Sequence, residues 1–103
     1  MRRDLDRLQD VLEAIDRIQQ RTSLSRESFD ADPLVQGWVV HHLEIVGEAC
    51  RGLSDELRSR YPEVPWSAII GMRNIEVWAA VERDVPKLRQ QVLAILEDER
   101  SRP

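Results

Sequence analysis

The sequence has few of the features that mark secreted or membrane-embedded proteins. Among its 103 residues there is one cysteine, Cys50, so no internal disulfide can form. No apolar run approaches the roughly 20 residues that a helix needs to span a bilayer. Residues 1–6 are charged and contain no apolar stretch, so we expect no secretory signal there. These features favour a cytoplasmic protein that makes no membrane contact.

The motifs of several common active sites are missing as well. The chain has no Cys-x-x-Cys, no His-Glu-x-x-His and no glycine-rich phosphate loop, so we expect neither a metal nor a cofactor. The formal net charge of −4 argues against tight, non-specific binding of RNA. It leaves room for a local cationic site, and it suits a basic protein partner.

The chain does contain strong helical periodicity. Residues 3–21 place apolar side chains at steps of three and four, which gives one apolar helix face. Residues 77–95 repeat this pattern but are interrupted by Pro86. Either Asp84 caps a new helix there, or one long helix is kinked. We expect a single all-α domain over residues 1–103, an antiparallel bundle of four to five helices, with a frayed tail over 97–103.

Between these two segments, Asp32 followed by Pro33 predicts a helix start, with Asp as the N-cap and Pro at the first helical position. This helix should continue to about Arg51. Apolar residues cover more than half of its circumference, which favours a central helix or one covered by a second subunit. Gly47 costs about 1 kcal/mol in mid-helix relative to Ala, so it predicts the close approach of another helix.

Shorter elements are expected elsewhere in the middle of the chain. Residues 22–32 are rich in Ser and Asp and predict a polar connection. Residues 54–60 predict a short helix, and Pro65 starts another that includes Ile69, Ile70 and Met72.

Two adjacent histidines on the central helix raise a question of metal binding. His41, Glu44 and Glu48 share one helix face, but carboxylate metal sites in bundles draw ligands from several helices. The alternative is that His42 is a buried or interfacial group hydrogen-bonded to a neighbour, with His41 partly exposed. The residue pattern favours this second interpretation.

Arg73 and Asn74 form the sharpest candidate site. The Arg guanidinium offers a fork of donors that matches phosphate oxygens, and Asn adds neutral donors and an acceptor. At a helix end the pair is suited to orienting a scissile phosphate and stabilising its developing charge. On these two residues alone, an Arg ion pair beside an Asn C-cap is the more common arrangement.

Four stretches shift that interpretation, because they follow the order of one known family and keep its spacing up to Ile75. They cover residues 43–49, 61–66, 69–74, and 77–78 with 84–88. Together they resemble the HEPN domains of the HepT-like toxin family. The resemblance implies a metal-independent endoribonuclease in its complete form, in which Arg73 and Asn74 begin the catalytic motif.

The sequence departs from the family just after this pair. The family continues through a segment that holds the catalytic histidine and a nearby tyrosine, whereas here Ile75 runs directly into Glu76. The segment is deleted naturally, deleted by engineering, or left out of the sequence. Tyr61 belongs to the earlier turn and is not the family's tyrosine. Whether His42 replaces the lost catalytic base stays open.

The resemblance also implies partners. HepT-like toxins pair with a MntA-like minimal nucleotidyltransferase antitoxin, which adds AMP to the missing tyrosine, and HEPN domains commonly form homodimers. The candidates for a dimer interface are Trp38, His42 and Gly47. Two functions are therefore expected as alternatives: the RNA-cleaving toxin of a toxin–antitoxin pair, or a catalytically dead, dimeric helical partner of the nucleotidyltransferase.

Overall fold

The computed structural model describes residues 2–22, 25–71 and 76–102, and within them the chain is all-α, as the sequence predicts. Arg73 and Asn74 lie outside the described residues. The elements, in order, are α1 (Arg2–Arg21), α2 (Arg26–Asp30), α3 (Pro33–Arg51), α4 (Asp55–Arg60), α5 (Trp66–Ile70), α6 (Val77–Ala79), the π-helical turn η1 (Ala80–Asp84) and α7 (Val85–Arg100). Within these residues no helix is long and apolar enough to cross a membrane.

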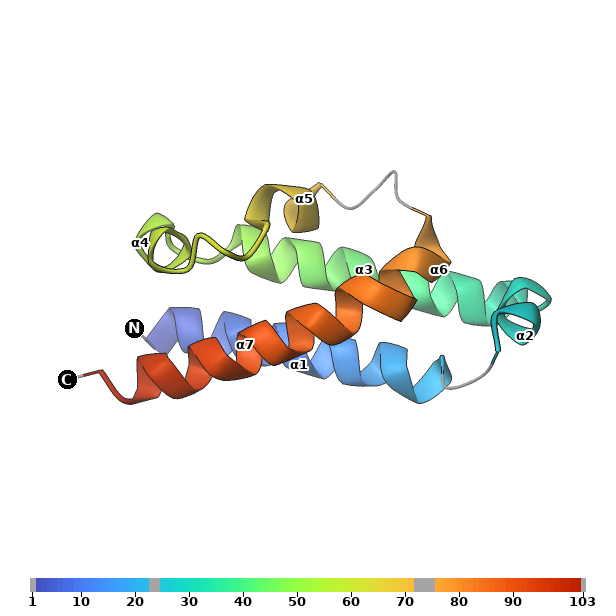
Figure 1. Ribbon diagram of the computed structural model, residues 1–103, viewed down its shortest axis with the longest axis horizontal. Helices are drawn as coiled ribbons and strands as arrows, with labels where there is room; N and C mark the ends of the chain where they lie inside the picture. Colours follow the sequence, from blue (N-terminus) through green and yellow to red (C-terminus); the bar gives the residue numbers. More distant parts are fainter. Residues whose placement is uncertain (1, 23–24, 72–75, 103) are drawn as a thin grey trace.

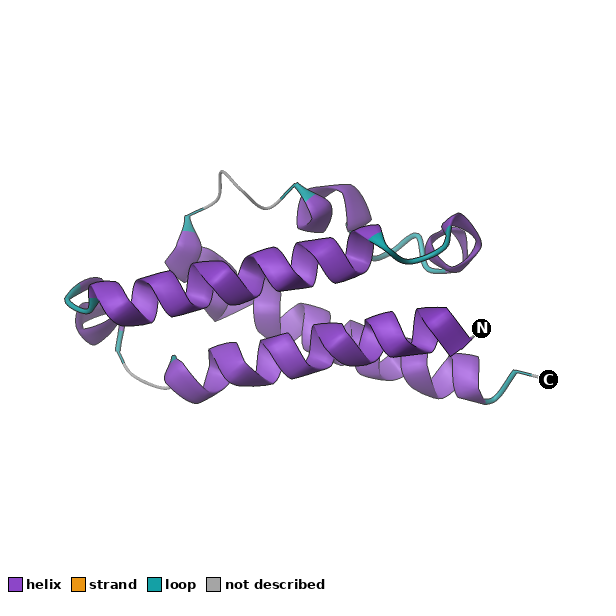
Figure 2. Cartoon of the chain, turned by 180° about the vertical axis from the view of Figure 1, so that it is seen from behind, coloured by secondary structure: helices purple, strands orange, loops and turns teal. Residues whose placement is uncertain are grey.

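Three long helices set the shape of the molecule, which extends over 48 × 22 × 20 Å. In Figure 1, α1 runs antiparallel to both α3 and α7, and it contacts both of them. The short helix α2 closes one end of the bundle, and α4 lies at the other end beside both chain termini (Figure 2). The shared core is formed by apolar side chains from all three long helices, including Leu8, Ile15, Val39, Val46 and Val92.

The predicted helix starts are confirmed by their capping contacts. The Asp32 carboxylate accepts hydrogen bonds from the backbone N–H groups of Leu34 (3.1 Å) and Val35 (3.3 Å), and Pro33 occupies the first turn of α3. The Ser54 hydroxyl accepts from the Leu57 N–H at 3.1 Å and so caps α4. These caps satisfy backbone donors that the first helical turn leaves without a partner inside the helix.

Two expectations about irregular segments are corrected. The polar connection over 22–32 contains α2, which is capped by Ser25 and buries Phe29 in contact with Trp78, their ring centroids 5.2 Å apart. The frayed tail expected from residue 97 is also corrected, because α7 continues to Arg100 and Glu99 is buried. Both segments are held by contacts distant in sequence.

The last helix follows the kinked-helix alternative. Asp84 has helical backbone angles (φ −77°, ψ −40°), so α6, η1 and α7 are continuous. In η1 the Val85 N–H donates to the Ala80 carbonyl, which is the wider i→i−5 pattern. In a regular α-helix, the Pro86 ring would clash with the carbonyl of Glu82 four residues earlier. The π-turn, which ends two residues before Pro86, accommodates this ring without ending the helix.

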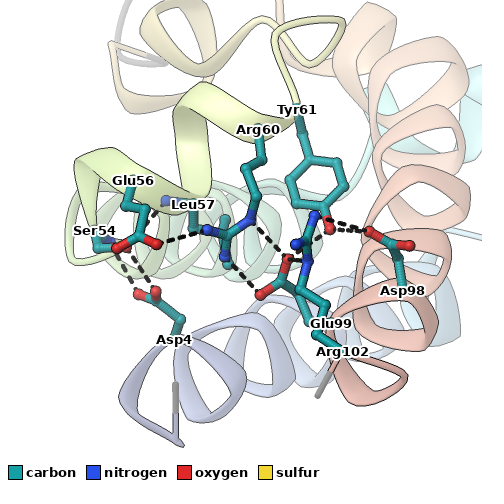
Figure 3. A network of polar contacts seen from close by, with 9 residues as sticks. All are labelled: Asp4, Ser54, Glu56, Leu57, Arg60, Tyr61, Asp98, Glu99 and Arg102. Atoms are coloured by element: carbon teal, nitrogen blue, oxygen red, sulfur yellow. Dashed lines mark hydrogen bonds and ion pairs between the residues drawn. The ribbon is translucent and has the colours of Figure 1, made fainter.

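A network of charged groups, the terminal clamp, joins the beginning, middle and end of the chain (Figure 3). Its members are Asp4, Ser54, Arg60, Tyr61, Asp98, Glu99 and Arg102. Asp4 accepts from the Ser54 N–H (2.9 Å) and hydroxyl (2.6 Å), which ties α1 to the start of α4. The Arg60 guanidinium donates to both oxygens of Glu99, at 2.7 and 3.1 Å, which ties the end of α4 to α7.

The clamp satisfies buried charge at the end of α7. The Tyr61 hydroxyl donates to Glu99 at 2.6 Å, and Arg102 donates to the same carboxylate at 3.1 Å. Burial by itself would raise the pKa of Glu99, but the hydrogen bonds from Arg60 and Tyr61 outweigh it and lower that pKa. Burial, together with the acceptors Asp98 and Glu99, raises the pKa of Tyr61 to about 12. The clamp therefore holds Glu99 ionised and Tyr61 protonated at neutral pH.

Candidate functional site

The candidate motif Arg73-Asn74 is connected to the described fold by two anchors, Gly71 and Glu76. Gly71 ends α5, where its N–H donates to the Ser67 carbonyl at 3.0 Å. Glu76 caps α6 by accepting from the Ala79 N–H at 2.9 Å, and its other oxygen pairs with Arg26 at 3.4 Å. The anchors therefore belong to α5 and to a helix start that is tied to α2.

Gly47 positions the first anchor on the central helix. A Cβ at Gly47 would lie 3.2 Å from the Ile69 carbonyl oxygen and 3.6 Å from that of Ile70. The predicted close approach of another helix is therefore confirmed, and the helix is α5 of the same chain. The missing side chain allows α5 to pack directly on the backbone of α3.

His42 has the buried, hydrogen-bonded role that the sequence favoured. Its side chain is buried, and its Nδ1 lies 2.8 Å from the Trp38 carbonyl oxygen. Because a carbonyl only accepts, Nδ1 carries the proton in this contact. The His42 ring packs on the Trp38 ring at 4.3 Å between centroids, with the neighbouring His41 edge-on at 5.2 Å. Burial and this fixed contact leave His42 poorly placed to replace a catalytic base.

The metal hypothesis gains no support from the arrangement. His41, Glu44 and Glu48 are all exposed on the outer face of α3. Across the described part of the chain, no three His, Cys, Asp or Glu side chains converge in a way that could hold a metal ion.

Trp38 faces the opposite side of α3 from Gly47. Its indole N–H donates to the Arg17 carbonyl at 3.4 Å, and the Arg21 guanidinium lies over its ring, 4.7 Å from the centroid. Trp38 thus packs against α1, whereas Gly47 packs against α5. The assignment of Trp38, His42 and Gly47 to a dimer interface stays a prediction, and each of the three has packing contacts within its own chain.

A cavity of about 180 Å³, here named the α5–α7 pocket, lies between α3, α5 and α7. Its walls are mainly apolar and its rim carries Asp84, Lys87 and Gln91. The lining residues are Val46, Pro65, Ala68, Ile69, Asp84, Val85, Lys87, Leu88 and Gln91. Sequence reasoning missed this pocket because its walls come from three separate helices. The polar positions on the face of α7 that carries Leu88 were the only local signal.

Comparison with known proteins places the chain in a family. The family model described as "Ribonuclease HepT-like" matches residues 11–95. The "Probable ribonuclease HepT" of Thermococcus cleftensis is 32% identical over 96 aligned positions, covering 82% of this chain and 87% of its own. A provisionally named RNase of Methanocaldococcus jannaschii is 33% identical and covers 82% of this chain and 89% of its own. No solved structure gives a significant match.

A longer relative adds information about length. A Methanocaldococcus jannaschii protein named as a gamma-glutamylcyclotransferase and provisional RNase is 32% identical, and the match covers 95% of this chain. The chain spans about half of that relative's length. The match extends over 111 aligned positions, more than the 103 residues of this chain, so the relative carries residues with no counterpart here. The family match over residues 11–95 nevertheless extends across all three long helices, and the chain belongs to the HepT-like ribonuclease family.

Proposed function

We propose that this chain is the RNA-directed toxin of a toxin–antitoxin pair, with the phosphate-binding half of the RNase motif kept and the proton-transfer half lost. Arg73 binds and polarises a backbone phosphate, and Asn74 helps to hold it. The observation that carries the proposal is the family match over residues 11–95, which includes both residues. In its complete form the protein cleaves RNA without a metal.

The loss of the second half follows from chemistry and length. Metal-independent cleavage needs a group that takes the 2′-hydroxyl proton and one that protonates the leaving oxygen, and histidine suits both because its pKa is near neutrality. No histidine follows Asn74, and His42 is buried against Trp38. The excess of aligned positions over chain length supports a missing segment, which we assign to the junction of Ile75 and Glu76.

The first experiment measures binding and cleavage of a labelled single-stranded RNA in EDTA. We expect wild-type protein to bind without cleaving, and Arg73→Ala to bind at least about tenfold more weakly, since a charge-assisted phosphate contact is worth roughly 1.5–3 kcal/mol. Arg83→Ala, which removes an exposed guanidinium from η1, is the matched control. Equal binding by the Arg73 and Arg83 variants would remove Arg73 from the site.

The second experiment restores the missing half. The Thermococcus relative carries residues that have no counterpart in this chain. Inserting these residues between Ile75 and Glu76 should produce cleavage that EDTA does not inhibit. Sequencing the coding DNA between these two codons is a simpler check. An in-frame segment with a histidine there would mean that the natural protein is the complete enzyme.

An alternative function is favoured by the net charge of −4 together with the absent histidine. In this case the chain is a catalytically dead, dimeric helical partner of a MntA-like nucleotidyltransferase and binds no RNA. Size-exclusion chromatography of the chain with a MntA-like nucleotidyltransferase tests this function. A stable complex, combined with no RNA binding by wild-type protein, would favour the partner over the toxin.

The proposed homodimer needs a test that does not rely on Gly47. A bulky residue there would strike the Ile69 carbonyl inside one chain, so loss of a dimer would be uninformative. Light scattering on wild-type protein and on Trp38→Ala is more direct, because Trp38 is only partly buried within the chain. A wild-type protein that is monomeric at micromolar concentration would remove the dimer from the proposal.

A further inference from the structure

We propose that the α5–α7 pocket binds one nucleobase of an RNA strand and prefers bases that carry an exocyclic amino group. The inference rests on the proposed function, because it names the part of an RNA substrate that this fold would recognise beside the phosphate. It is carried by the size of the pocket, the chemistry of its rim and its position along the chain.

The size of the pocket suits a single planar ring. An apolar cavity of roughly 150 Å³ binds benzene, so a cavity of about 180 Å³ has room for one base and is too small for a helix. Its inner wall is formed by the buried side chains of Val46, Val85 and Leu88. Apolar walls favour the faces of a base, which every nucleobase presents, over a hydrated ion.

The polar groups at the rim can form hydrogen bonds with a base. An apolar protein side chain in the same pocket would leave them without partners. The Asp84 carboxylate is a hydrogen-bond acceptor, so it pairs with the amino groups of guanine, adenine or cytosine. Uracil has no such amino group. The Gln91 amide both donates and accepts, and the Lys87 ammonium offers a cation for the phosphate of the same nucleotide.

The position of the pocket links it to the proposed phosphate site. Ile69 lines the pocket, and Arg73 follows it by four residues. At about 3.5 Å per residue, the two Cα atoms are separated by no more than ~14 Å. A strand whose phosphate is held by Arg73 therefore carries a base within reach of the pocket.

The experiment titrates the four nucleoside 5′-monophosphates, and inorganic phosphate separately, into isotope-labelled full-length protein and records backbone amide shifts by NMR. We expect saturable shifts at Ala68, Val85 and Leu88 with the guanine, adenine and cytosine nucleotides. Uridine monophosphate should bind several-fold more weakly, and phosphate alone should leave these amides unchanged. Equal shifts with phosphate alone, or no shift with any nucleotide, would overturn the proposal.

Two variants and one matched control sharpen the test. Ala68→Leu places a larger side chain at the pocket and should weaken nucleotide binding about tenfold or more. Ala94→Leu makes the same change at an exposed position of α7 outside the pocket and should leave binding unchanged. Asp84→Asn is nearly isosteric at an exposed position, and it should remove the preference against uracil. Equal effects of both leucine variants, or an unchanged preference in Asp84→Asn, would contradict the base site.

The two proposals fail in different ways. If Arg73→Ala weakens RNA binding while Ala68→Leu does not, the pocket is wrong and the phosphate site stands. If Ala68→Leu weakens nucleotide binding while Arg73→Ala leaves RNA binding unchanged, the reverse holds. Binding of indole at the pocket with no binding of any nucleotide would make it a receptor for a partner's apolar side chain and overturn the base site.

Discussion

The terminal clamp and the α5–α7 pocket are built on opposite principles. In the clamp, buried carboxylates on α1 and α7 are matched by donors, and among the described residues no buried side-chain polar atom lacks a hydrogen-bond partner. In the pocket, three helices approach one another but leave an apolar space with polar groups at its rim. Filled space and satisfied charge favour stability, whereas retained space favours binding. We therefore expect mutations in the clamp to change stability and mutations in the pocket to change recognition.

The largest effect on stability is expected from Glu99→Ala. The Glu99 side chain is 3% exposed and accepts from Arg60, Tyr61 and Arg102, so its removal leaves several donors without their acceptor. Breaking a buried ion pair by removing one partner is strongly destabilising, and we expect a loss of about 2–3 kcal/mol in the free energy of unfolding. The measurement is urea denaturation, with the slope of the transition checked for constancy.

The matched control for this prediction is Glu97→Ala, which removes an exposed carboxylate two residues earlier on the same helix. It should change the free energy of unfolding by no more than about 0.5 kcal/mol. Similar losses in both variants would mean that the clamp stabilises the fold no more than an ordinary surface charge does.

The clamp also marks what sequence reasoning could not reach. The caps by Asp32 and Ser54 were predictable because each depends on residues within three positions of it. The Arg60–Glu99 pair joins residues 39 positions apart, and only the packed bundle brings them together. Reading the polar end of the sequence locally therefore predicted fraying where the fold places a buried carboxylate.

The candidate site divides in the same way. The role of Gly47 was predictable, because a mid-helix glycine is a local signal. The role of Arg73 and Asn74 stays a prediction, since both lie outside the described residues. Which helix packs against Gly47 was not predictable, since α3 carries apolar residues on several faces. Only the tertiary contacts show that α5 covers the face with Gly47. The π-turn before Pro86 was anticipated only as a kink, because sequence does not specify how a helix accommodates the ring.

Two glycines of α3 allow the packing beside the pocket to be tested. Gly47→Leu should destabilise the fold by about 1–3 kcal/mol, because the new side chain strikes the backbone of α5. Gly37→Ala should instead stabilise it by about 0.5–1 kcal/mol, since no described atom beyond its chain neighbours and the nearby backbone of α3 lies within 4 Å of a Cβ at that position. Urea denaturation of both variants gives the values. A stability for Gly47→Leu equal to that of wild type would contradict the direct contact of α3 with α5.

Alkaline pH should weaken the clamp through Tyr61. Its pKa is raised from about 10 when unfolded to about 12 when folded, so the native state holds the proton more tightly. This contribution is fully present below pH 10 and is lost as pH rises towards 12. Burial raises the pKa of Cys50 to about 12, which adds a loss of the same sign from about pH 9. Thermal melts from pH 8 to 12 should therefore show falling stability.

Tyr61→Phe separates the two contributions. Phenylalanine does not titrate, so the variant should be less stable at pH 8 but lose less stability between pH 10 and 12 than wild type does. Parallel curves for the two proteins would show that the pKa of the Tyr61 hydroxyl is the same in the folded and the unfolded state. The slope left in the variant would then report on Cys50 and on the other groups that titrate in this range.

A small effect on stability is expected from Pro86→Ala, in the kinked helix next to the pocket-lining residue Val85. The substitution restores a backbone N–H and removes the ring that a regular helix could not accept, so the turn over Ala80–Asp84 can tighten to the α-helical pattern. The gain of a hydrogen bond offsets the greater freedom of the unfolded chain, and we expect a net change within about 1 kcal/mol in the free energy of unfolding.

The change in geometry should be easier to detect than the change in stability, because tightening of the turn rotates α6 relative to α7 and moves Trp78 away from Phe29. Near-ultraviolet circular dichroism and amide hydrogen exchange over residues 80–85 measure that rotation. Unchanged spectra and exchange would mean that the packing of α6, and not the proline, sets the π-turn, and Asp84 would then keep its place at the rim of the pocket in both proteins.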